Sequence, residues 1–302
     1  MSKLVINIAF PCYIVYHMPN AISWESLVFN WYYPVLGAAL LAGADIFGYV
    51  TARIWAVGGE AGTFRMLTGL PNWVFMALAV AEPLYGLEAV RVILLFNVGI
   101  QFYLWSFGMT SFRGGLDRKA IKDMFLNIQI IASVIGLTIA LAFPGVRGME
   151  RLGLDELGAL PFHIGILVPV WETLYFIAMV TLPLSIMQIG LQLALPKSST
   201  ATAEHDRRNL VITTFLRLFI APLISLGMLI VISRLGFRLS QGEFVTSILI
   251  MSMPAAVTCI SISEMYGGNN ALAAKGVLWT TILSLGTAPV MNWIASNAYA
   301  WA

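Results

Sequence analysis

The residues with the clearest chemical meaning are a proline inside an apolar stretch and the polar side chains that follow it. Pro254 lies near the middle of the apolar run 244–262, which is long enough to cross a bilayer. Proline removes one backbone donor, and its ring clashes with the carbonyl four residues earlier, so a helix breaks there. A backbone group freed in hydrocarbon is costly unless a partner satisfies it. A broken helix with small neighbours such as Ala255 is typical of a solute pathway, and a tolerated proline kink is the alternative.

The same pattern occurs earlier in the chain. Pro71 is followed by Glu82 and a Tyr-Gly pair, and Pro254 by Glu264 and a Tyr-Gly pair, at spacings that agree to within two residues. The distribution of Lys and Arg orients the two segments in opposite directions, as in an inverted repeat. We therefore predict an incomplete first repeat of four helices at 1–111, a cytoplasmic linker at 112–125 and a second repeat of five helices at 126–302.

The composition predicts an all-α polytopic membrane protein. The chain of 302 residues is 59% hydrophobic and only 11% charged, whereas soluble domains carry roughly 25% charged residues. The formal net charge of +2 is too small to suggest a nucleic-acid partner. The two cysteines and three histidines are scattered, so we expect no disulfide, no metal site and no cofactor.

The elements that must position these residues are apolar segments of about 20 residues, the length of a spanning helix. The expected spans are about 3–18, 27–53, 66–86, 90–111, 126–145, 162–194, 210–233, 244–264 and 270–295. Lys and Arg gather on one side of these spans, which predicts a cytoplasmic N-terminus. Nine is an odd number, so the C-terminus is expected outside the cell membrane.

Three polar side chains, those of Asn72, Asn7 and Asp45, fall at membrane depth, where polar groups are costly and ionisable groups are candidates for function. Asn72 follows Pro71 and could either satisfy freed backbone or hold a carboxylate substrate. Asn7 and Pro11 make a similar pair in the first span. Asp45 lies in a glycine-containing span, where it is either bonded to a neighbouring helix or a site for a proton or substrate.

Three further charges lie nearer the ends of spans. Glu82 and Glu264 occupy matching positions in the two repeats, and are either solvated span ends or residues that share a role in closing a cavity. Arg217 lies about two turns from the cytoplasmic end of its span. We expect it to snorkel to that surface, with attraction of an anion as the alternative.

The C-terminal end resembles the auxin efflux carrier family. Its last two helices carry a mid-membrane proline and then a stretch like LAA-x-x-V-L-x-T-T-x-L-S-x-x-T-x-P, which here runs from Leu272 to Pro289. The first span, with Asn7 and Pro11, is similar to the family's second helix, and 71–86 is similar to its fourth. The family's proline in that fourth helix aligns with Ala79, so the break is expected at Pro71 instead.

The resemblance implies a ten-helix fold of two inverted five-helix repeats, shared with bile acid:sodium symporters. This chain then lacks the first family helix, which fits nine spans. In the family, two broken helices cross near the midplane and form the substrate site. Carried over to this sequence, the substrate-binding candidates are Asn7, Pro71, Asn72, Pro254, Ala255 and Glu264.

We therefore predict a secondary transporter for a small organic anion, working by alternating access in the plasma or inner membrane. Its partners are an organic acid, the lipid bilayer and, as an option, a second copy of the chain. One alternative is a proton- or sodium-coupled symporter that uses Asp45, Glu82 or Glu264. Another is a transport-inactive sensor or scaffold. A membrane enzyme is disfavoured because no ionisable residues converge at one depth.

Overall fold

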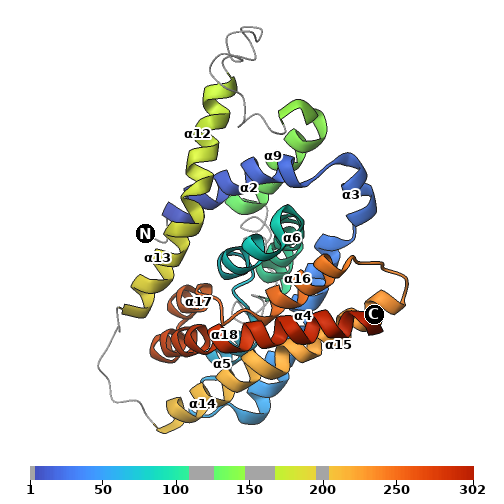
Figure 1. Cartoon of the computed structure of the whole chain (residues 1–302). Helices are drawn as coiled ribbons and strands as arrows, with labels where there is room; N and C mark the ends of the chain where they lie inside the picture. Colours follow the sequence, from blue (N-terminus) through green and yellow to red (C-terminus); the bar gives the residue numbers. More distant parts are fainter. Residues whose placement is uncertain (1–3, 109–125, 147–166, 195–203) are drawn as a thin grey trace.

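The computed structural model describes residues 4–108, 126–146, 167–194 and 204–302, and its regular elements are helices (Figure 1). Four stretches are long and apolar enough to cross a membrane, namely Trp24–Trp55, Phe75–Gly108, Glu204–Arg234 and Asn270–Trp301. Two shorter apolar helices are Ile128–Ala142 and Val168–Leu184. The chain is therefore a helical, multi-pass membrane protein, as its composition predicts. The expected linker at 112–125 lies outside the described residues.

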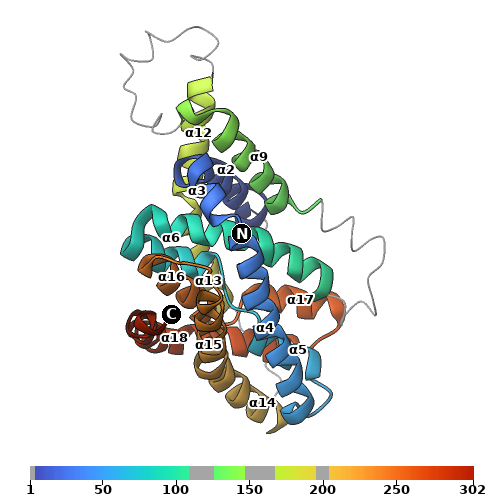
Figure 2. The ribbon, with the colours of Figure 1, turned by 90° about the vertical axis from the view of Figure 1, so that its right-hand side faces the viewer.

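The helices pack in two groups, and most of the smaller group lies in the upper part of Figures 1 and 2. This small bundle consists of η1 (Val5–Ala9), α2 (Phe10–Ala21), α9 (Ile128–Ala142), α12 (Leu167–Met179) and α13 (Thr181–Ala194). The Thr181 hydroxyl donates to the carbonyl of Ala9 at 2.9 Å. Gly136 of α9 lies so close to α2 that an added Cβ would be 3.0 Å from Met18 Cβ. These contacts join helices from both halves of the sequence.

The large bundle contains the remaining long helices. They are α4 (Tyr33–Trp55), α5 (Ala61–Gly69), α6 (Phe75–Tyr103), α14 (Glu204–Phe215), η5 (Leu216–Ile220), α15 (Ala221–Arg234), α16 (Gln241–Ser252), α17 (Thr258–Tyr266) and α18 (Asn270–Ala298), and α3 (Trp24–Asn30) leads into them. The closest approach is between α4 and α6, where a Cβ added to Gly99 would lie 1.6 Å from the carbonyl oxygen of Pro34. Only glycine fits at that position.

Helix α6 is interrupted at Gly86, which has φ 61° and ψ −146°. Residues with a Cβ rarely adopt a positive φ, so glycine allows the chain to turn here. Pro83, three residues earlier, weakens the helix on the approach to this turn. The interruption separates a first part that leads away from Phe75 from a second part that ends at Tyr103. The interruption lies where the sequence predicts the boundary between the spans 66–86 and 90–111.

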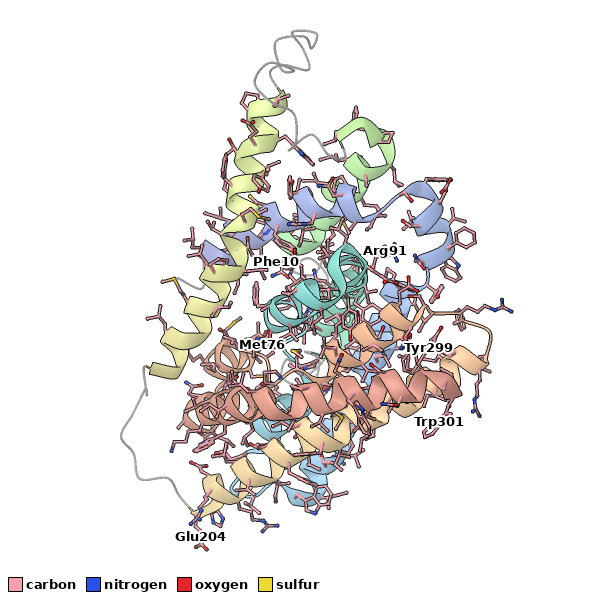
Figure 3. The ribbon with its side chains drawn as sticks, viewed as in Figure 1. Phe10, Met76, Arg91, Glu204, Tyr299 and Trp301 are labelled. Atoms are coloured by element: carbon pink, nitrogen blue, oxygen red, sulfur yellow. The ribbon has the colours of Figure 1, made fainter. Side chains whose placement is uncertain are left out.

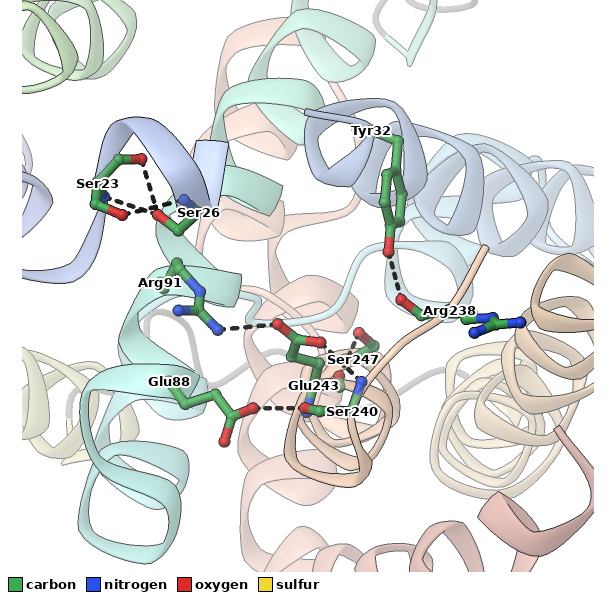
Figure 4. A network of polar contacts seen from close by, with 9 residues as sticks. All are labelled: Ser23, Ser26, Tyr32, Glu88, Arg91, Arg238, Ser240, Glu243 and Ser247. Atoms are coloured by element: carbon green, nitrogen blue, oxygen red, sulfur yellow. Dashed lines mark hydrogen bonds and ion pairs between the residues drawn. The ribbon is translucent and has the colours of Figure 1, made fainter. Parts of the chain in front are cut away.

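A polar network joins the second part of α6 to the start of α16 (Figure 4). Ser240 and Glu243 form a capping box, in which each side chain bonds the other residue's backbone N–H. Glu243 also accepts from Arg91 at 2.9 Å, and Ser240 donates to Glu88 at 2.5 Å. These bonds fix the N-terminus of α16 against α6.

The two chain ends lie on opposite sides of the molecule in Figure 1. Helices α2 and α18 run between those sides. Glu204 at the start of α14 and Trp301 beyond α18 also lie at opposite ends in Figure 3. Large apolar side chains are exposed on the outer faces of several helices, among them Ile46 of α4, Phe176 of α12, and Trp279 and Trp293 of α18. Apolar outer faces of this kind suit contact with lipid.

Candidate functional site

Two helices break and their broken segments cross each other in the large bundle. Helix α5 ends at Gly69 and α16 ends at Ser252, and the residues that follow, 70–74 and 253–257, are not helical. The Asn72 N–H donates to the carbonyl of Pro254 at 2.7 Å, and Pro71 and Ala255 form an antiparallel bridge. We call this pair of segments the crossing. Both prolines therefore stand at breaks, as predicted, and each broken segment satisfies backbone groups of the other.

Helix α18 supports the crossing through a threonine. The Ala255 N–H donates to the Thr280 hydroxyl at 3.1 Å, and that hydroxyl donates to the carbonyl of Gly276 at 2.7 Å. Thr280 is fully buried. It belongs to the Thr-Thr pair at 280–281, but nothing in the sequence indicated this contact.

Arg217 lies at the crossing, and the expectation that it snorkels to the surface is wrong. Its side chain is fully buried in η5. The guanidinium donates to the carbonyls of Thr68 at 3.1 Å and Gly69 at 3.3 Å, and also to the carbonyl of Met251. These carbonyls end α5 and α16, where the helix dipole places partial negative charge. A cation is stabilised there without reaching water.

The helices that follow the two breaks, α6 and α17, begin at a cavity of about 430 Å³. Its walls include Asn72, Phe75 and Thr258 of the large bundle, and Asn7 and Phe10 of the small bundle. The cavity therefore lies between the bundles, at the N-termini of α6 and α17. No Asp, Glu, Lys or Arg is among the described residues that line it.

The residues at the N-cap positions of the two helices that begin at this cavity do not cap them. Val74 and Val257 occupy the N-cap positions of α6 and α17, and neither makes a side-chain cap bond. In contrast, Asn127, Ser240 and Asn269 cap α9, α16 and α18. At α6 the Asn72 amide oxygen accepts from the Met76 N–H at 3.5 Å, so Asn72 satisfies freed backbone there. The other first-turn N–H groups and the positive end of the helix dipole favour an anion.

Amide side chains of Gln101, Asn127 and Gln129 also line the cavity. Gln101 of α6 donates to Gln129 of α9, which joins the large and small bundles, and accepts from the Trp105 indole at 2.9 Å. The Trp73 indole donates to Asn97 at 3.1 Å. These residues were missed in the sequence because single amides in apolar runs carry no spacing signal.

The predicted substrate-binding residues lie in three different places. Asn7 and Asn72 line the cavity. Pro71, Pro254 and Ala255 instead form the crossing behind it, where they are buried, while the neighbouring Ala256 reaches the cavity wall. Glu264 is exposed and does not line the cavity.

The predicted coupling residues lie away from the cavity. Asp45 accepts from Arg65 at 2.7 and 2.5 Å and from the Tyr103 hydroxyl at 2.9 Å, which agrees with a carboxylate bonded to neighbouring helices. Glu82 accepts from the Tyr13 hydroxyl at 2.9 Å. Neither carboxylate is among the residues that line the cavity.

Comparison with known proteins shows that the C-terminal part of the chain is similar to one protein family. Residues 179–301 match the model of the Sodium Bile acid symporter family, and no curated protein matches the chain. The matched range contains Arg217, the second broken helix and the α17 wall of the cavity. The family is one of transporters and not of enzymes, as the sequence predicts, whereas the resemblance to auxin efflux carriers stays a prediction. Over residues 179–301, this multi-pass membrane protein is therefore similar to a family of membrane transporters.

Proposed function

We propose that the protein is a secondary transporter that moves a small organic anion across the cell membrane. The observation that carries this proposal is that the C-terminal ends and the N-terminal ends at the two breaks have different electrostatic partners. Arg217 neutralises the C-terminal ends, while the N-terminal ends, which their own N-cap residues leave uncapped, face a cavity lined by no acidic side chain in the described part of the chain. A carboxylate in the cavity is stabilised by N–H groups and helix dipoles without a full positive charge.

The walls of the cavity indicate what the rest of the substrate resembles. Four aromatic side chains line it, namely Phe10, Trp73, Phe75 and Trp105, beside the amides of Asn7 and Gln101. Apolar walls with a few placed polar groups suit a small organic molecule. A carboxylate on an apolar body fits this lining, in line with the organic anions that the resemblance to auxin efflux carriers implies.

Alternating access follows from the position of the cavity between the bundles. Movement of one bundle past the other would close one side of the cavity and open the other side. Each bundle contains helices from both halves of the sequence, so the moving unit is one bundle and not one repeat. The matching breaks at Pro71 and Pro254 support two inverted repeats, 1–111 and 126–302, with nine spans.

The orientation of the chain gives the cavity a direction. The excess of Lys and Arg favours a cytoplasmic N-terminus and an external C-terminus, and the opposite positions of the two chain ends support this. Leu126 and Met265, which line the cavity, are 60% and 65% exposed and form its mouth. They lie at the start of α9 and the end of α17, on the same side as the N-terminus. The cavity then opens to the cytoplasm.

Sodium-coupled symport is the second candidate, because the matched family is named for it. Oxygen ligands for a hard cation would come from Thr258 and Ser261 in the α17 wall of the cavity. Flux with and without a sodium gradient separates the two candidates. Equal flux with and without the sodium gradient would contradict sodium-coupled symport and support the uncoupled transporter.

The proposed function is tested by flux of organic acids into proteoliposomes. Asn72→Ala removes a cavity amide, and Pro254→Leu rebuilds the helix through the crossing, so both variants should lose flux while they still insert. Asn297→Ala is the matched control, since Asn297 is exposed and bonds only its own helix at Trp293. Normal flux in both crossing variants would remove these residues from the mechanism.

A further inference from the structure

The side of the cavity away from its mouth is closed by contacts between the two bundles. Helix α2 of the small bundle packs against α6 of the large bundle. The ring of Phe10 meets the ring of Phe75 edge-on, with centroids 5.2 Å apart. Both residues line the cavity, so this aromatic pair forms its closed end.

One turn farther along α2, a polar bond joins the bundles again. The Tyr13 hydroxyl donates to the Glu82 carboxylate at 2.9 Å, and Tyr13 is only 1% exposed. Tyr13 is three residues beyond Phe10, and Glu82 is two turns beyond Phe75. The bond therefore lies behind the aromatic pair and does not touch the cavity.

The tyrosine ring is fixed by its own bundle. His17 stacks on Tyr13 with ring centroids 4.0 Å apart. The ring of Phe10 also stacks with that of Tyr13, with centroids 6.3 Å apart. Loss of the hydroxyl alone would thus leave the ring in position. What such a change removes is the hydrogen bond to the large bundle, and bonds to a carboxylate are among the stronger ones in proteins.

We propose that the Tyr13–Glu82 contact is a gate that holds the two bundles together on the side of the cavity opposite its mouth. This inference rests on the proposed alternating access, because a bond between bundles that slide past each other must break once in each cycle. Neither residue touches the substrate, so both act by setting how often this side opens. The gate also gives Glu82 a role that is distinct from ion coupling.

The test measures access to the cavity from the side on which the C-terminus lies. Ser261→Cys places a thiol in the cavity wall, in a background that lacks both native thiols (Cys12→Ala, Cys259→Ala), and a membrane-impermeant thiol reagent is added to that side only. Tyr13→Phe should raise the labelling rate at least about fivefold. Glu82→Gln should raise it less, because an amide oxygen still accepts a hydrogen bond.

Tyr85→Phe is the matched control. It loses the same hydroxyl from a bond of the same length, but its acceptor, Asn292, lies in the same bundle. This control should leave the labelling rate unchanged. The combined Tyr13→Phe and Glu82→Gln variant should label no faster than Tyr13→Phe alone, since the two changes remove one bond.

Equal labelling rates for Tyr13→Phe and Tyr85→Phe, or additive effects of Tyr13→Phe and Glu82→Gln, would overturn the gate. Labelling needs no substrate, so its outcome is separate from that of the flux assay. If no organic acid is transported but the labelling pattern is as described, the gate is supported and the proposed transport of an organic anion is contradicted. Melting temperatures of all variants show whether a rate change merely reflects loss of the fold.

Discussion

The guanidinium of Arg217 lies 3.1 Å from the carbonyl oxygen of Thr68, although 149 residues separate the two in the sequence. It also reaches the last turn of α16 through Met251. One buried cation therefore joins the C-terminal ends of both broken helices. The backbone N–H groups at the N-terminal ends of α6 and α17 are then the polar groups of the two breaks that a solute can bind.

Removal of the Arg217 side chain should destabilise the crossing. Arg217→Met leaves the carbonyls of Thr68, Gly69 and Met251 buried without this donor, and the expected loss of unfolding free energy is about 1–3 kcal/mol for each carbonyl left unsatisfied. Arg217→Lys should lose less, because an ammonium keeps the charge but not the planar fork. Denaturant titration in detergent micelles measures both. Arg234→Met is the control, since Arg234 bonds the carbonyl of Trp301 at the exposed end of the chain.

The role of Thr280 can be isolated by comparison with the next residue. Thr280→Val keeps the shape of the side chain but leaves the Ala255 N–H unsatisfied, at a cost of about 1–3 kcal/mol. Thr281→Val loses a similar bond to its own helix, at the carbonyl of Val277, and touches no part of the crossing. Equal stability of the two variants would show that the crossing does not depend on Thr280.

Asp45 and Arg65 give a test that separates structure from coupling. Asp45→Asn should cost about 3–5 kcal/mol, because it leaves the Arg65 guanidinium buried without its counter-ion. The double variant Asp45→Leu, Arg65→Met should recover much of this loss. A stable Asp45→Asn protein whose flux no longer responds to a proton gradient would instead identify Asp45 as a coupling residue.

Close packing of α4 on α6 predicts that Gly99 tolerates no side chain. Gly99→Ala places a methyl group 1.6 Å from the Pro34 carbonyl oxygen, so the helices must separate and the melting temperature should fall. Gly227→Ala in α15 is the control, because its added Cβ meets nothing within 4 Å. That variant should be unchanged or slightly more stable. The same melting temperature for both variants would contradict the packing of α4 on α6.

The parts of the site that sequence could predict are those with a local cause. The breaks follow from Pro71 and Pro254 alone, and the membrane class follows from composition. The position of Arg217 could not be predicted, because the carbonyls that bind it come from distant segments. Tyr13 and Glu82 are likewise 69 residues apart. The sequence halves also gave no sign that each bundle takes helices from both of them.

The central claim is that the N-terminal ends of two broken helices hold a negatively charged group. Its most direct test is equilibrium binding of indole-3-acetate and of its neutral amide, which differ in charge but little in shape, to the purified protein. The acid should bind at least about tenfold more tightly than the amide, and Asn72→Ala should reduce that ratio. Equal affinity for the acid and the amide, or tighter binding of the amide, would contradict an anion site at the crossing.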